Sequence, residues 1–132
     1  MAIYYKRSSI TTLDTNTAWD STGPTGPGPA GPPTVTDTAQ WDASSLGGTL
    51  NGSFGANPLQ FNSASGVGVI HASGTITLGP NGINTTNSSE VKTFIANNID
   101  VGSNDQTWTM YGNTGLGVVK GDLSSIFVGW IS

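Results

Sequence analysis

The chain has 132 residues, of which only 9% are charged and 35% hydrophobic, with 19 glycines, 7 prolines and no cysteine. This length fits one domain, and the lack of cysteine excludes disulfides, thiol catalysis and thiolate metal sites. The net charge of −4, with only four basic residues, argues against nucleic-acid binding, which needs clustered cations. No stretch is apolar for long enough to span a bilayer or act as a secretory signal, so we expect a chain that folds in a cytoplasm and binds no membrane.

Residues 1–33 are predicted to form an extended N-terminal arm followed by a Gly/Pro-rich linker. Ile3-Tyr4-Tyr5 is a short strand-like patch that either frays as a terminus or adds to the sheet edge of a neighbouring subunit. The linker, residues 23–33, is collagen-like, but its Gly-X-Y register breaks at Gly28. This composition favours an extended polyproline II tether, either a strap across a subunit boundary or a surface loop. The expected interface prolines are Pro24, Pro27, Pro29, Pro32 and Pro33.

Residues 34–132 are predicted to form a β-strand domain. Short segments of alternating apolar and polar residues are separated by turn signals such as Asn51-Gly52 and Gly79-Pro80-Asn81-Gly82. Residues 89–96 are the one stretch with a possible helical reading, and they alternate better as a strand. The pattern therefore predicts an all-β protein, and it fits a meander, a β-sandwich or a solenoid equally well.

The strand segments come in a characteristic order: Trp41-Asp42, Gly47-Gly48-Thr49-Leu50, Leu59-Gln60-Phe61, Ile76-Thr77-Leu78-Gly79 and Gln106-Thr107-Trp108-Thr109. Over about residues 34–120, this order resembles the passenger β-helix repeats of autotransporters, a pattern shared with bacteriophage virion proteins. The resemblance implies a short β-helix or β-solenoid-like stack, with the β-sandwich as the alternative. Autotransporters carry a secretion signal and a membrane barrel, which are not expected here, so the phage structural proteins are favoured. A stack of few coils has open ends that must be capped or shared.

Candidate catalytic groups are few in this sequence. Asp100 with Asp105, or Asp37 with Asp42, could form a carboxylate pair of the kind that cleaves glycans, but Asp beside Gly, Asn and Ser more often caps turns. His71 is the only histidine, and no loop has calcium-ligand spacing. We therefore expect no catalytic residue, no cofactor and no metal, and a protein that is not an enzyme.

The C-terminal stretch Ile126 to Ile131 carries no charge and would promote aggregation if exposed. We expect it to be buried in the core or against another subunit, with Phe127 and Trp130 joining Tyr4 and Tyr5 as interface anchors. The resulting hypothesis is a homotrimeric capsid decoration or cement protein, assembled into a virion in the host cytoplasm. It would stabilise the head through multivalent contacts with the major capsid protein. The alternatives are a receptor-binding module of a tail fibre or spike, and a glycan hydrolase.

Overall fold

The computed structural model describes residues 2–8, 10–42, 49–62, 69–71, 73–84, 92–96, 98–103, 105–109 and 114–118. Within these residues the protein is all-β, which confirms the predicted class, and its one helix is a short 3-10 turn, η1 (Asn16–Ala18). None of the described residues forms a helix that could cross a lipid bilayer.

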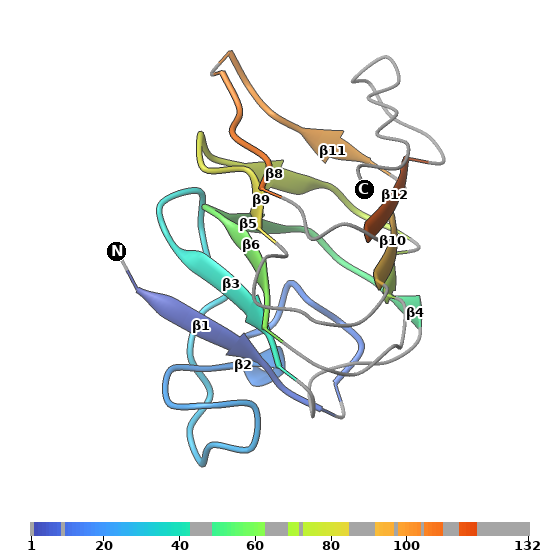
Figure 1. The fold of residues 1–132 in the computed structure, drawn as a ribbon. Coiled ribbons are helices and arrows are strands. Elements are labelled where there is room, and N and C mark those ends of the chain that lie inside the picture. The colour runs from blue at the N-terminus through green and yellow to red at the C-terminus, as the bar shows by residue number, and fades with distance from the viewer. Residues whose placement is uncertain are drawn as a thin grey trace.

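The strands of the described residues form three sheets (Figure 1). In spatial order, the first sheet contains β2 (Trp19–Asp20), β1 (Ile3–Lys6), β3 (Thr38–Trp41), β6 (Leu59–Phe61) and β9 (Ile83–Asn84). The second sheet contains β12 (Thr114–Val118), β10 (Lys92–Ala96), β7 (Val69–His71) and β4 (Thr49–Leu50). The third sheet contains β11 (Ile99–Asp100), β8 (Ile76–Leu78) and β5 (Phe54–Ala56).

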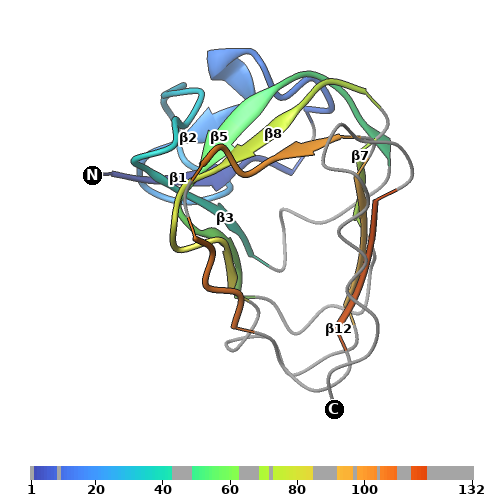
Figure 2. The same cartoon turned by 90° about the horizontal axis from the view of Figure 1, so that it is seen from above.

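From β3 to β11 the chain passes from the first sheet to the second, then to the third, and back to the first. Seen from above, the three sheets lie on three sides of a shared interior (Figure 2). From β3 onward, paired strands are parallel, and their partners lie 20 to 25 residues apart in the sequence. Successive passes of the chain are therefore stacked on one another.

The core forms because side chains alternate between the two faces of each strand. In β3 and β6, Trp41, Leu59 and Phe61 are at most 2% exposed and belong to the core, whereas Gln40 and Gln60 occupy the alternate positions. The register places Gln40 beside Gln60, so in β3 and β6 an apolar row faces the core and a polar row, only 8% exposed, lies on the other face. This arrangement buries the apolar side chains of successive passes without an α-helix or a disulfide.

Four aromatic rings, those of Trp19, Trp41, Phe54 and Phe61, form one cluster in the core. Trp19 meets Trp41 edge to face with ring centroids 5.5 Å apart, and Phe54 contacts both rings at 5.3 and 5.7 Å. Phe61 continues the contact at 5.7 Å from Trp41. Aromatic pairs of this geometry contribute about 0.5–1.5 kcal/mol each beyond the burial of their area. Trp19 precedes the predicted strand domain, so the cluster joins the first part of the chain to the sheets.

The N-terminal segment (residues 2–8 and 10–37) packs on the rest of the chain. Strand β1 pairs in parallel with β3 and antiparallel with β2, within its own chain. Both edges of β1 are therefore paired inside this chain. Leu13 and Trp19 are fully buried, so the segment supplies part of the core.

The expectation of an extended tether is wrong for residues 23–30. Gly26 N–H donates to Gly23 O at 3.0 Å, and Ala30 N–H donates to Trp19 O at 3.1 Å, so the loop folds back on β2. The Asp20 carboxylate accepts a further bond from Gly28 N–H at 2.9 Å. The proline and glycine pattern gave no sign of this acceptor, which lies upstream of the linker.

Trp19 and Trp41 offer a matched test of this core. Both side chains are fully buried, but Trp19 Nε1 donates to Leu13 O at 2.8 Å, whereas Trp41 Nε1 has no acceptor among the described residues. Trp19→Phe is therefore expected to lower the free energy of unfolding by about 1–2 kcal/mol more than Trp41→Phe. Only Trp19→Phe leaves a buried carbonyl, that of Leu13, without its hydrogen-bond donor. Urea unfolding of both variants measures the difference. Equal losses would show that the Trp19 hydrogen bond is not formed.

Candidate functional site

Asp37 connects the start of the chain to the loop that enters β3. Its carboxylate accepts bonds from Ala2 N–H at 3.1 Å, Thr34 N–H at 2.9 Å and the Thr34 hydroxyl at 2.8 Å. Burial opposes ionisation of Asp37, but the bonds from Thr34 and Ala2 outweigh it and lower the pKa of this carboxyl. Asp37 therefore stays ionised at neutral pH and fixes the position of β1.

Asp20 has the same role in the folded-back loop. It is 1% exposed, and its carboxylate accepts bonds from Thr22 N–H, the Thr22 hydroxyl, Gly23 N–H and Gly28 N–H at 2.6 to 3.2 Å. The Thr22 hydroxyl, followed by the Thr22 N–H, lowers the pKa of Asp20 despite its burial. Stability from Asp20 and Asp37 is present above the unfolded pKa of Asp, about 3.9. It is lost as the pH falls through the lowered folded values.

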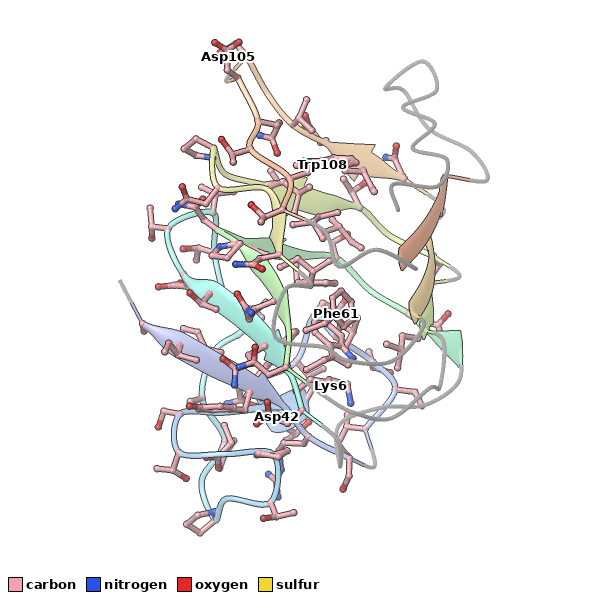
Figure 3. The ribbon with its side chains drawn as sticks, in the orientation of Figure 1. Lys6, Asp42, Phe61, Asp105 and Trp108 are labelled. Atoms are coloured by element: carbon pink, nitrogen blue, oxygen red, sulfur yellow. The ribbon has the colours of Figure 1, made fainter. Side chains whose placement is uncertain are left out.

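Of the four carboxylates in the predicted pairs, Asp37, Asp42 and Asp100 accept hydrogen bonds from other groups. Asp42 accepts from Gln40 Nε2 at 2.9 Å, and Asp100 accepts from Gly102 N–H at 2.8 Å, which is the turn-capping role expected of Asp. In Figure 3, Asp105 lies at the top of the molecule and Asp42 in its lower half. Among the described residues, no three His, Cys, Asp or Glu side chains are grouped so as to hold a metal ion. The backbone of His71 lies in β7, and its side chain is outside the description.

Lys6 is a charged side chain placed on the inward face of β1. It is 1% exposed, and its Nζ donates to Arg7 O (Figure 3). Its register partner in β2 is Trp19, and the preceding residue, Tyr5, pairs with Gln40 of β3. Burial in these surroundings lowers the pKa of Lys6 from 10.5 to about 8.

The predicted interface residues lie in different environments. Tyr4 and Tyr5 are half-buried in β1, and Tyr4 packs against the core. Among the prolines, Pro33 is buried and Pro24 half-buried, which leaves Pro27, Pro29 and Pro32 exposed. Phe127 and Trp130 lie outside the described residues. The seven described residues therefore range from buried to exposed, and the role of the set as an interface stays a prediction.

The large apolar side chains most exposed in the described residues are Ile3 and Val35, at 45% and 40%. Ile3 pairs with Thr38 of β3, three residues after Val35, and Thr38 N–H donates to Ala2 O at 2.8 Å. In Figure 1 the N-terminus and the loop that enters β3 lie on the same side of the molecule. We call this pair of side chains the Ile3–Val35 corner. Asp37 accepts bonds from Ala2 N–H and Thr34 N–H, the residues that precede Ile3 and Val35, and the corner is a partly apolar candidate for an interface.

Sequence reasoning missed the roles of four residues: Ile3, Lys6, Asp20 and Val35. Ile3 alternates with Tyr4, so a strict period of two would have placed Ile3 and Tyr5 outside, and Tyr4 and Lys6 inside. The run Asp20-Ser21-Thr22-Gly23 has the composition of a side-chain-capped turn. No sequence signal identifies Val35, because its exposure depends on how the loop crosses the third sheet.

No protein-family model, no curated protein and no solved structure matches this chain.

The buried lysine is expected to cost stability at neutral pH. Lys6→Met should raise the free energy of unfolding at pH 7 by about 1–3 kcal/mol, because it removes an ammonium held in an apolar core. The wild-type protein should gain stability between pH 8 and 10.5, because the unfolded lysine there binds a proton that the folded one has lost. The advantage of the variant should shrink over the same range.

Chemical denaturation at several pH values measures this effect, with Arg7→Met as the control for a neighbouring cation that is not buried. A Lys6→Met protein that is less stable than wild type at pH 7 would contradict the prediction, because the ammonium would then be a net stabiliser.

Proposed function

We propose that the protein is a structural component of a virion, a decoration or cement protein that binds the major capsid protein. In this proposal it assembles as a homotrimer in the host cytoplasm and strengthens the head through repeated weak contacts. Support comes from the resemblance of residues 34–120 to phage β-helix repeats and from the exposed Ile3–Val35 corner.

The fold proposed for this role is a short parallel β-helix. Three features support it: the rotation of the chain through three sheets, the parallel pairing from β3 onward, and the spacing of 20 to 25 residues between partners. A β-sandwich of the immunoglobulin kind is built from antiparallel neighbours. In the described residues the antiparallel strand pair is β1 with β2. The β-helix is therefore the better interpretation.

The Ile3–Val35 corner is the observation that carries the proposed function. Two aliphatic side chains remain 45% and 40% exposed although the backbone beneath them is held by Asp37 and by the β1–β3 ladder. A fixed backbone loses little entropy when the corner docks on a partner. The apolar area is small, so each contact would be weak, and useful affinity requires several copies on one particle.

Replacing both corner side chains tests this role. Ile3→Ser with Val35→Ser should reduce the copies bound per particle about tenfold or more, since burial of each aliphatic side chain contributes roughly 1 kcal/mol or more. Quantitative mass spectrometry of virus particles from the encoding organism measures the copy number. Thr25→Ser, an exposed change outside the corner, should leave it unchanged.

The copy number of the wild-type protein also distinguishes the cement protein from the receptor-binding alternative. Hundreds of copies of the wild-type protein per particle agree with a cement protein. A few copies confined to the tail would favour the receptor-binding alternative. Absence from particles would refute both.

A further inference from the structure

After the N-terminal segment, the chain begins the three sheets with β3, β4 and β5. The N-terminal segment covers one edge of each of these strands. In the first sheet, β3 pairs with β6 on one side and with β1 on the other. Beyond β1 lie β2 and then the loop, where Asp20 bridges to Pro29. The last two layers are antiparallel to their neighbours, so the parallel order of the sheet stops here.

The second sheet is closed by residues 11–13. Strand β4 is the end strand of this sheet, and Asn51, which directly follows β4, forms a parallel bridge with Thr12. Asn51 N–H donates to Thr11 O at 2.8 Å, and Leu13 N–H donates to Asn51 O at 2.6 Å. Leu13 is fully buried, which anchors this short piece in the core.

The third sheet is closed by the loop that precedes β3. Strand β5 is its end strand, and Gly55 N–H donates to Pro33 O at 3.0 Å. Phe54 and Ala56 belong to the core, so a Cβ on Gly55 would project away from it. That Cβ would lie 2.6 Å from the carbonyl carbon of Thr34 and 2.7 Å from the Val35 nitrogen. Glycine at position 55 therefore permits the loop to lie directly on the strand.

Uncovered, these three edges would form one assembly surface. An unpaired strand edge is a template for another strand, and from β3 onward all three sheets are parallel. A second copy could add its last strands to these first strands and continue each sheet in register. Such contacts join unlike surfaces and do not close, so they generate filaments.

We propose that the first-strand edges of the three sheets are a latent docking surface for a second copy of this chain, and that the N-terminal segment is the cap that closes it. This inference goes beyond the proposed virion role and does not depend on it. The occupant is a second copy because its own strands have the matching direction and spacing. Stacked-repeat proteins need such terminal caps to remain soluble.

Gly55→Ala tests the cap, with Gly28→Ala as the matched control. The added methyl at Gly55 displaces the Thr34 backbone, whereas a Cβ at Gly28 meets nothing within 4 Å. Gly55→Ala should form species whose sedimentation coefficient grows continuously with concentration, visible as filaments by electron microscopy. The wild-type protein and Gly28→Ala should keep one sedimentation coefficient over the same range.

The proposal fails if hydrogen exchange shows that the amide at position 55 is unprotected in Gly55→Ala while the sedimentation coefficient still matches that of the wild type. Circular dichroism establishes whether the variant is folded. If it is not, Thr38→Pro replaces it, since this change removes the bond to Ala2 O at the start of β3, where proline is tolerated. Concentration-dependent filaments from folded Thr38→Pro support the cap, and an unchanged sedimentation coefficient overturns it.

Discussion

The edge-to-face contact between Trp19 and Trp41, at 5.5 Å, unites the two parts of the chain. No described strand exceeds five residues, so none of them is stable alone and each depends on stacking against the next. The first pass of a stack has no earlier pass to pack on. Trp19 supplies that missing neighbour, because it contacts both Trp41 and Phe54 and is fully buried. The contact makes the N-terminal segment part of the fold, and the coverage of the three sheet edges follows from it.

Polar groups in the N-terminal segment then fix its path. Asp20 holds the folded-back loop and Asp37 holds the corner, and each carboxylate accepts at least three hydrogen bonds. Lys6 opposes this pattern, since its ammonium is buried and, among the described residues, the carbonyl of Arg7 is its acceptor. A chain with so few charges uses two of them, Asp20 and Asp37, to organise one end of the molecule. The exposed Ile3–Val35 corner and the capped edges both depend on that organisation.

The sequence predicted the all-β class because alternation and turn signals are local, and residues 92–96 form the strand expected of them. The path of residues 2–37 could not be predicted in this way. The pairing of β1 with β3 joins residues that are distant in sequence, such as Ile3 and Thr38, and no local pattern records it. The burial of Lys6 was hidden because a lysine is normally assigned to the surface. The corner was missed for a different reason: the exposure of Val35 follows from the tertiary path of its loop.

Native-state hydrogen exchange tests most directly whether the N-terminal segment is an integral cap. The amides of Leu13, Thr38 and Gly55 form hydrogen bonds that join the N-terminal segment to the sheets. The amides of Leu59 and Ile76 form hydrogen bonds between later passes of the chain. If the segment is integral, both groups exchange only through global unfolding, with protection that agrees within about tenfold. Rapid exchange at Leu13, Thr38 and Gly55 while Leu59 and Ile76 stay protected would show that the segment detaches on its own. The sheets would then fold without a cap.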